Sequence, residues 1–124
     1  MRLEGEESEE TLREANNYAN LLILLQRSEE AKSLLLKAMP VARRVLGEEN
    51  ILTLDGRLTY AQTLCEPEGA TLDDLREGVS TLEDVGRTAR RVLGAAHPTV
   101  TVRIEPALQK ARAKLRAGEA SGSP

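Results

Sequence analysis

The sequence predicts an all-α protein built from repeated helix pairs, and three observations support this prediction. The segment TLREANNYANLL at residues 11–22 returns as TLDGRLTYAQTL at residues 53–64, an offset of 42. The hexapeptide ARRVLG at residues 42–47 returns at residues 89–94, an offset of 47. Apolar residues within these segments recur at helical spacing. Because self-similarity at a period of roughly 20–50 residues is typical of repeat arrays, we expect two repeats, with about five extra residues in the second.

Composition is consistent with a folded helical chain. Of the 124 residues, 40% are hydrophobic and 30% charged, which is usual for a soluble domain. The chain has no Trp and no Phe, so its core must be built from Leu, Val, Ile and Ala. Such a core fills the narrow space between close-packed helices, but it offers few aromatic anchors for a ligand.

Charge and cysteine content restrict the function and the compartment. The formal net charge of −3 argues against a nucleic-acid partner, which requires a basic surface. Four arginines occupy equivalent places in the two repeats, and we interpret them as a solvated helix face: Arg43, Arg44, Arg90 and Arg91. No apolar run approaches the ~18 residues of a membrane span, and the start of the chain is acidic, unlike a signal peptide. The single cysteine, Cys65, favours a reducing compartment, so we expect a cytoplasmic protein without membrane association.

The first repeat is predicted to occupy residues 10–47, after a flexible acidic segment at residues 1–9. Its first helix should span residues 10–26, with Ser8 or Thr11 as the N-cap. The apolar stripe of this helix, at i, i+3, i+4 and i+7 spacing, comprises Leu12, Ala15, Tyr18, Ala19, Leu22 and either Ile23 or Leu25.

The second helix should begin at the cap Ser28 and end at Leu46, with Gly47 as the stop signal. Pro40 lies inside it, and we expect a kink after which the helix resumes, in preference to two separate helices.

The second repeat is predicted to occupy residues 48–94. Its first helix, at about residues 52–65, repeats the earlier one, so Tyr60 should have the same surroundings as Tyr18. A five-residue loop follows, and Thr71 with Asp74 forms a capping-box-like start for a helix that ends before a second glycine stop at residue 94. Glycines inside this helix weaken it, but they permit close contact with a neighbouring helix.

Residues 95–117 should form a connector and a fifth helix, at about residues 101–117. Ile104, Leu108 and Leu115 lie on one side of this helix, where they can cover the open end of the second repeat. Residues 118–124 are predicted to be a flexible tail.

The sequence resembles tetratricopeptide repeats of the kinesin-light-chain type. The residues that carry the resemblance are NNYA at 16–19, EEA at 29–31, VLGEEN at 45–50 and VLGAAHP at 92–98. The second copy departs from the pattern, with LTYA at 58–61 in place of an NNLA-like motif and Gly78 in place of a small Ala. The first connector has Asn50-Ile51 where the pattern has His-Pro. The resemblance covers roughly residues 11–115.

The resemblance implies a right-handed superhelical stack of antiparallel helix pairs, with two repeats and a C-terminal capping helix. In this family the first helices line a concave groove that commonly holds an extended peptide or a partner helix. The positions that would face the groove are Arg13, Asn16, Asn17, Asn20, Asp55, Thr59 and Gln62. Asn and Gln side chains carry both a donor and an acceptor, which suits pairing with a peptide backbone. The alternative is that Asn16 and Asn17 bond to local backbone or face water.

Catalytic and metal-binding chemistry is not expected. His97 is the only histidine, and we interpret it as a turn residue that bonds the connector. Cys65 lies on an apolar face, which favours a small buried core residue over a reactive thiol. Acidic pairs occur at helix starts, where the helix dipole accounts for them. The sequence contains no phosphate-binding loop, no nucleophile elbow and no metal-ligand spacing, so no enzyme activity and no cofactor are predicted.

Two functional hypotheses remain open. In the first, the chain is a scaffold that binds a protein or peptide in its concave groove. In the second, it is an assembly element that forms a homodimer, because about three repeats are usually needed for a stable stack. The run Leu21, Ile23, Leu24 and Leu25 has too many apolar residues for one buried stripe, so some of them should face a neighbour. A fragment of a longer array would show the same feature.

Overall fold

The computed structural model describes residues 6–122, and they contain helices but no strand. In chain order the elements are α1 (Glu6–Leu24), α2 (Ser28–Leu46), α3 (Ile51–Cys65), α4 (Leu72–Leu93), the short π-helix η1 (Thr99–Ile104) and α5 (Glu105–Gly122). The all-α prediction is confirmed. Parts of the predicted flexible ends, residues 1–5 and 123–124, lie outside the described residues.

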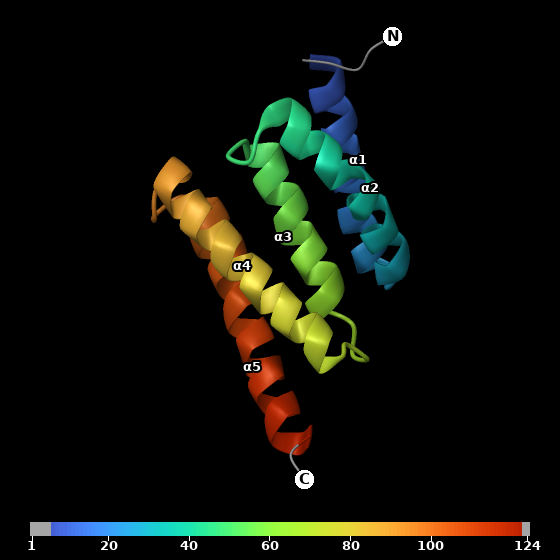
Figure 1. Ribbon diagram of the computed structural model, residues 1–124, viewed down its shortest axis with the longest axis vertical. Helices are drawn as coiled ribbons and strands as arrows, with labels where there is room; N and C mark the ends of the chain where they lie inside the picture. The colour runs from blue at the N-terminus through green and yellow to red at the C-terminus, as the bar shows by residue number, and fades with distance from the viewer. Residues whose placement is uncertain (1–5, 123–124) are drawn as a thin grey trace.

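Successive helices run in alternating directions and pack as pairs (Figure 1). Helix α1 packs against α2, and α3 packs against both of them. Helix α4 packs against α3, and η1 with α5 then lies against α4 and part of α3. Helix α3 therefore occupies the middle of the molecule, with the first helix pair on one side and α4 with α5 on the other (Figure 1).

The core consists of two clusters of buried aliphatic side chains. The smaller cluster joins α1 to α2 and contains Ala19, Leu22, Ala31, Leu35 and Met39. The larger one joins α3, α4, η1 and α5, and contains Leu58, Leu82, Val85, Ile104 and Leu108 among others. Tyr60 packs against both clusters and so links the two halves of the molecule. Ile104 and Leu108 are buried in this larger cluster, with the half-buried Leu115 packed against it.

Tyr18 and Tyr60 do not share the same surroundings, so that expectation was wrong. Tyr18 is 53% exposed on α1. Tyr60 is half-buried, and its hydroxyl donates a hydrogen bond to Glu77 in α4 at 3.0 Å. The physical reason is position, because α3 has packed helices on both sides whereas α1 has them on one side only.

The first helix begins and ends earlier than predicted. It starts at Glu6, within the segment expected to be flexible, and positions 8 and 11 lie inside the helix, so neither residue is its N-cap. At the other end, Gln26 adopts a left-handed backbone with φ of 63°. Its N–H donates to the Ile23 carbonyl and the Arg27 N–H donates to the Leu22 carbonyl, the hydrogen-bond pattern of a Schellman motif. The helix therefore stops at Leu24.

Helices α2, α3 and α4 match their predicted bounds to within one residue. The prediction of Ser28 as the cap of α2 was wrong, because Ser28 is the first helical residue and the N-cap, Arg27, makes no side-chain capping bond. Helix α2 continues unbroken past Pro40, so it is not split there. Thr71 caps α4 by accepting a hydrogen bond from the Asp74 N–H, and the Asp74 carboxylate accepts one from the Thr71 N–H. The predicted capping box is thus confirmed.

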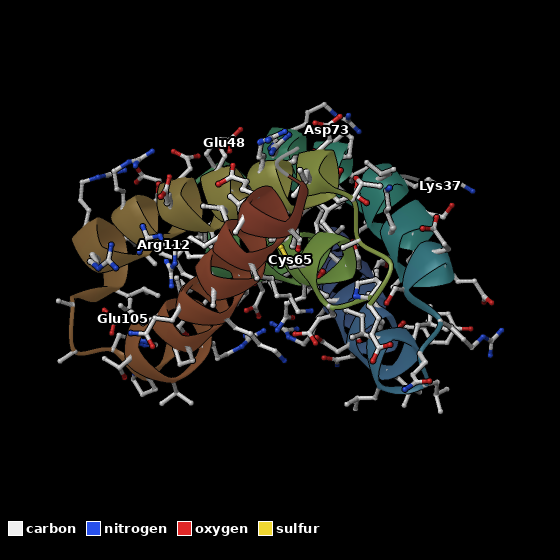
Figure 2. All side chains as sticks on the ribbon, turned by 90° about the horizontal axis from the view of Figure 1, so that it is seen from below. Lys37, Glu48, Cys65, Asp73, Glu105 and Arg112 are labelled. Carbon is white, nitrogen blue, oxygen red and sulfur yellow. The ribbon has the colours of Figure 1, made fainter. Side chains whose placement is uncertain are left out.

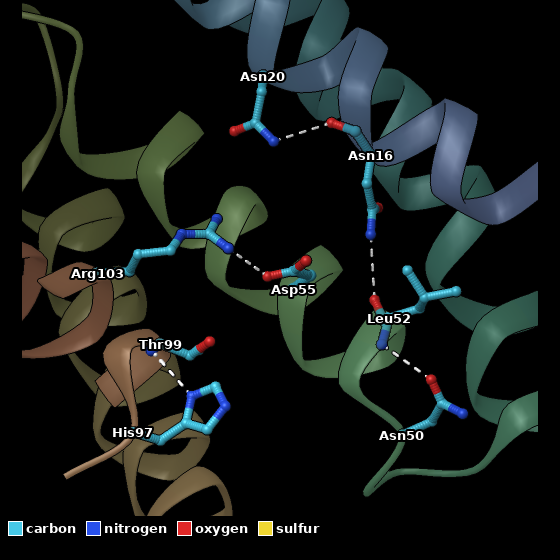
Figure 3. A network of polar contacts seen from close by, with 8 residues as sticks. All are labelled: Asn16, Asn20, Asn50, Leu52, Asp55, His97, Thr99 and Arg103. Carbon is cyan, nitrogen blue, oxygen red and sulfur yellow. Dashed lines mark hydrogen bonds and ion pairs between the residues drawn. The ribbon is translucent and has the colours of Figure 1, made fainter. Parts of the chain in front are cut away.

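The two connectors repeat each other in geometry as well as in sequence. Gly47 and Gly94 both have positive φ, 92° and 98°. Three residues after each glycine, a side chain accepts a hydrogen bond from the N–H two residues further on. Asn50 Oδ1 accepts from Leu52 at 2.8 Å, and His97 Nδ1 accepts from Thr99 at 3.1 Å (Figure 3). The interpretation of His97 as a turn residue is confirmed.

The last helical segment differs most from its prediction. It opens with the π-helix η1, in which the Glu105 N–H donates to the Val100 carbonyl five residues earlier. Pro106 has no N–H, so it cannot complete the ordinary α-helical bond at this point. Helix α5 then extends to Gly122, through most of the predicted flexible tail. A Cβ on Gly118 would lie 2.7 Å from Leu72 Cδ2, which shows that this extension rests against the start of α4.

Candidate functional site

The seven predicted groove residues differ widely in exposure. Arg13 and Asn17 are exposed on α1. Three others are half-buried, namely Asn20, Asp55 and Gln62. Two are buried, Asn16 at 7% and Thr59 at 0% exposure. The side chains of Asn16 and Thr59 are therefore covered in this structure, and the assignment of the seven residues to peptide binding stays a prediction.

Asn16 joins two helices. Its Nδ2 donates to the Leu52 carbonyl of α3 at 3.1 Å, and a Cβ on Gly56 would lie 3.3 Å from its Oδ1 (Figure 3). The backbone N–H of Leu52 donates to Asn50 Oδ1. Two asparagines thus bond to both backbone polar groups of Leu52, at the start of α3. If α1 shifted on α3, this bond would break and leave a buried polar group without a partner, which lowers the free energy of unfolding by about 1–3 kcal/mol. Asn16 therefore helps to fix the position of α1 on α3.

The other polar residues on this side also bond within the molecule. Asn20 donates to the Asn16 carbonyl at 3.0 Å. Asp55 pairs with Arg103 of η1, with 2.5 Å between the carboxylate and guanidinium atoms (Figure 3). These polar side chains of α1, α3 and η1 therefore mostly bond within and between the helices (Figure 3). Arg13 lies 3.9 Å from Glu9 in a long i,i+4 contact.

Thr59 and Gln62 lie on the inner sides of α3. The Thr59 hydroxyl is buried without a hydrogen-bond partner among the described residues. Gln62 borders a small gap between α3 and α5, beside Lys110 and Lys114. Lys114 donates to the carbonyls of Cys65 and Glu66, at 2.6 and 3.2 Å. Gln62 therefore lies beside a contact between helices that closes the end of α3.

A second candidate surface is the exposed apolar face of α1. Tyr18 is 53% exposed, Leu21 49%, Leu24 79% and Leu25 56%. Their spacing of three, three and one residues places them along one side of the C-terminal half of α1 and its end. We call these four residues the α1 face. The run of Leu residues in the sequence predicted that some would be exposed, but Tyr18 was assigned to the buried stripe.

The repeat explains why an apolar surface exists here. With the offset of 42, Asn17, Tyr18 and Leu21 correspond to Thr59, Tyr60 and Thr63 of α3. Those three α3 positions face the interior: Thr59 and Thr63 are 0% and 4% exposed, and Tyr60 packs against the cluster of the first helix pair. The corresponding positions of α1 have no packed helix over them among the described residues. Tyr18 and Leu21 of the α1 face are therefore the counterparts of α3 residues that lie against packed helices.

An acidic cleft adjoins the α1 face. Its volume is about 820 Å³, and it lies between the turn after α1 and the loop after α3. It is lined by Ile23, Leu24, Gln26, Arg27, Ser28, Glu29, Glu30, Glu66, Pro67 and Glu68. The side chain of Arg27 is paired with Glu30 through two bonds, at 2.9 and 2.8 Å. Because four glutamates and one arginine line the cleft, it carries negative charge beside an apolar surface.

Three titratable groups, Cys65, Asp84 and Tyr60, have pKa values shifted by their surroundings. Cys65 is buried between α3, α4 and α5, and burial raises the pKa of its thiol to about 11 (Figure 2). This confirms the interpretation as a core residue, since the thiolate is the nucleophile. In α4, a hydrogen bond from Arg57 lowers the pKa of Asp84. Burial and the bond to Glu77 raise the pKa of Tyr60.

The arginines that end the second helices of both repeats are mostly paired with acids. Arg43 lies 3.4 Å from Glu48, and Arg90 lies 3.6 Å from Glu105. A 2.7 Å ion pair with Glu49 holds Arg91. These contacts lie at or beside the connectors, so the arginines help to fix the turns there.

The residues 6–122 contain no group of three or more His, Cys, Asp or Glu side chains placed to hold a metal ion. None of the described helices has both the length and the apolar composition that a membrane crossing requires. No family model, curated protein or solved structure matches the chain. The assignment of a function therefore depends on the surfaces described above.

Proposed function

We propose that this chain is a helical-repeat module that binds other proteins, and that the α1 face with its adjoining cleft is the contact surface. The observation that carries the proposal is the exposure of Tyr18, Leu21, Leu24 and Leu25. The α3 counterparts of the first two are covered, because Tyr60 packs against the cluster of the first helix pair and Thr63 is 4% exposed. An apolar surface bordered by charged groups is characteristic of interaction sites on soluble proteins. A helix is the partner that best suits it, because α3 offers the same positions to helices.

The proposal includes a right-handed stack of the tetratricopeptide type. Its support comes from the repeated connectors at Gly47 and Gly94 and from the packing of α1 on α3 and of α3 on α5. In such a stack the first helix of each pair lies beside the first helix of the next. Contacts between neighbouring repeats then supply much of the stability.

The concave groove receives less support than the α1 face. Two of the seven groove residues, Asn16 and Thr59, are buried, and Asp55 is engaged by Arg103. Arg13 and Asn17 are exposed side by side on α1 and are the groove residues that remain accessible. A peptide bound in the groove would have to use mainly these two side chains.

A display selection tests the proposal. A library of helical peptides is selected against the whole chain, and each enriched peptide is then titrated against three variants. Binding should weaken at least about tenfold in the variant that combines Leu21→Asp and Leu24→Asp, since a buried charge opposes docking of an apolar helix. The matched control is Leu36→Asp, which introduces a charge at a leucine 51% exposed on α2.

Circular dichroism establishes that all variants remain helical. The assignment would be overturned in favour of the groove by peptides whose affinity is unchanged in the variant with Leu21→Asp and Leu24→Asp but is reduced in a variant that combines Arg13→Ala and Asn17→Ala. A selection that enriches no peptide with preference for the native chain over the α1 variant would also overturn it.

A further inference from the structure

We propose that the α1 face of one copy of this chain receives α5 of a second copy, so that copies stack head to tail. This inference rests on the proposed function, because it names the partner of the same surface. Three features of the described residues carry it: the repeat equivalence of α1 and α3, the side chains exposed on α5, and the opposite charges of the two helices.

The repeat equivalence defines what the α1 face accepts. The corresponding face of α3 packs against the first helix pair, with Tyr60 on the apolar cluster of that pair. A Cβ on Gly56, the counterpart of Glu14, would lie 3.7 Å from Met39 Cγ of α2. A helix that packs on the α1 face would repeat this contact. Helix α5 packs on α4 with one side and is exposed on the other, so a second copy can present that exposed side.

Helix α5 exposes a side suited to large apolar neighbours. One line of exposed residues, spaced three or four positions apart, runs from Pro106 through Gln109 and Ala113 to Ala117 and Ala120. Exposed charged residues lie beside this line, among them Lys110, Arg112 and Arg116. Small side chains allow a neighbouring helix to approach closely, and leucine and tyrosine side chains can then fill the space between them. Val102 of η1 is 67% exposed and lies four residues before Pro106, so it continues this line of residues towards the N-terminus.

The two helices carry opposite charge. The sequence of α1 contains five glutamates and one arginine, whereas α5 contains four basic and two acidic residues. The cleft beside the α1 face adds four glutamates to the acidic surface. Within one copy, Lys110 of α5 already lies 3.5 Å from the cleft residue Glu66. The α5 helix of a second copy, packed on the α1 face, would bring basic side chains such as Arg116 close to the glutamates of α1 and of the cleft.

Charge also selects between the two ways in which copies can meet. A two-fold pairing of α1 with α1 would place two acidic helices together, whereas pairing of α1 with α5 joins opposite charges. The two surfaces lie on different sides of α3, because α1 packs with α2 and α5 packs with α4 (Figures 1 and 2). One copy can therefore use both at once, and such a heterologous contact produces rings or open chains of copies.

A charge-swap experiment on the whole chain tests this inference. The first variant combines Glu10→Lys and Glu14→Lys on α1, and the second combines Gln109→Glu and Arg116→Glu on α5. All four residues are exposed. Sedimentation velocity of the native chain should show a mass that rises above 13.6 kDa with concentration and decreases in ~0.5 M NaCl. Each variant alone should associate about tenfold more weakly, because several exposed ion pairs are lost or reversed.

An equimolar mixture of the two variants should regain association, because each then offers a complementary end to the other. A native chain that stays at 13.6 kDa at millimolar concentration overturns the inference. So does association that is unaffected by the α5 variant, because that result indicates an α1–α1 contact. If the chain is monomeric and the selected helical peptides still bind the α1 face, the proposed function stands and only this partner is wrong.

Discussion

Gly78 of α4 lies directly against Cys65 of α3: a Cβ built on Gly78 would stand 2.2 Å from the cysteine Sγ. The same Cβ would be 3.4 Å from the Ala61 carbonyl oxygen and 3.7 Å from Leu64 Cβ. The absence of a side chain at position 78 therefore sets how closely α3 and α4 approach. In the first repeat the corresponding residue is Ala31, which is fully buried. A small residue is needed at both places.

The first prediction concerns this contact. Gly78→Ala should lower the free energy of unfolding by about 1–2 kcal/mol, because the overlap with Cys65 outweighs the ~1 kcal/mol that alanine gains in helix propensity. Cys65→Ala in the same chain removes the Sγ and should restore most of the loss. Urea unfolding of the four chains in this double-mutant cycle measures the coupling.

Gly69→Ala is the control, since a Cβ at Gly69 meets nothing within 4 Å. Additive effects of the substitutions at residues 65 and 78 would contradict the close contact.

The second prediction concerns the thiol of Cys65. Burial raises its pKa from 9.0 to about 11, so the folded state holds this proton more tightly than the unfolded state. Its contribution to stability is fully present below pH 9 and is lost as the pH rises towards 11, by roughly 2–3 kcal/mol. Cys65→Ala should remove this part of the alkaline destabilisation, as measured by urea unfolding between pH 8 and pH 11.

Iodoacetamide provides an independent measurement of the same thiol. At pH 8 the folded chain should react far more slowly than the chain in urea, because reaction requires the thiolate and access to it. Equal rates in the two states would show that the Cys65 side chain is accessible in the folded protein.

The third prediction concerns the end of α1. Gln26 holds a left-handed backbone with φ of 63°, a conformation that favours glycine. Gln26→Gly should raise the free energy of unfolding by about 0.5–1 kcal/mol, because it relieves that backbone strain.

Gly47→Ala provides the reverse comparison. Its φ is 92° and a Cβ there meets no atom within 4 Å, so any destabilisation must come from the backbone alone. It should lower the free energy of unfolding by about 1 kcal/mol. Thermal denaturation of both variants checks the pair, and two changes of the same sign would contradict the argument.

The fourth prediction separates two neighbouring asparagines. Asn16→Asp should lower the free energy of unfolding by about 2–4 kcal/mol at pH 7, because it places a carboxylate against the buried carbonyl of Leu52. Asn17→Asp makes the same chemical change at an exposed position and should change it by less than about 0.5 kcal/mol. Similar losses in both variants would show that Asn16 has no special role in joining α1 to α3.

The sequence predicted the helices well where the signals were local. The cap at Thr71, the glycine stops at 47 and 94 and the continuity of α2 through Pro40 all depend on residues within a few positions of each other. The end of α1 was predicted less well, because no glycine marks it and Gln26 takes the left-handed conformation instead. Helix α5 was predicted too short, because its last turns pack against Leu72, some 46 residues earlier in the chain.

In the candidate site, too, the sequence predicted features that depend on nearby residues, but it did not predict contacts between distant ones. Helical periodicity placed Arg13, Asn17 and Asn20 on α1, but it could not show that Asn16 would bond to Leu52 or that Arg103 would engage Asp55. Those bonds join residues 36 and 48 positions apart, and their formation depends on how the helices cross. The exposure of Tyr18 was not predicted either. Its counterpart Tyr60 is half-buried because helices pack on both sides of α3, whereas α1 has packed helices on one side only.

The sequence by itself determined that the chain is helical, that it repeats and where its connectors turn, because spacing, caps and glycines act within single turns of helix. Only the tertiary structure decided which polar side chains form hydrogen bonds or ion pairs within the molecule and which apolar side chains remain exposed on its surface. That outcome depends on which helices lie on each side of a residue, and helix α1 has neighbours on one side whereas α3 has them on both.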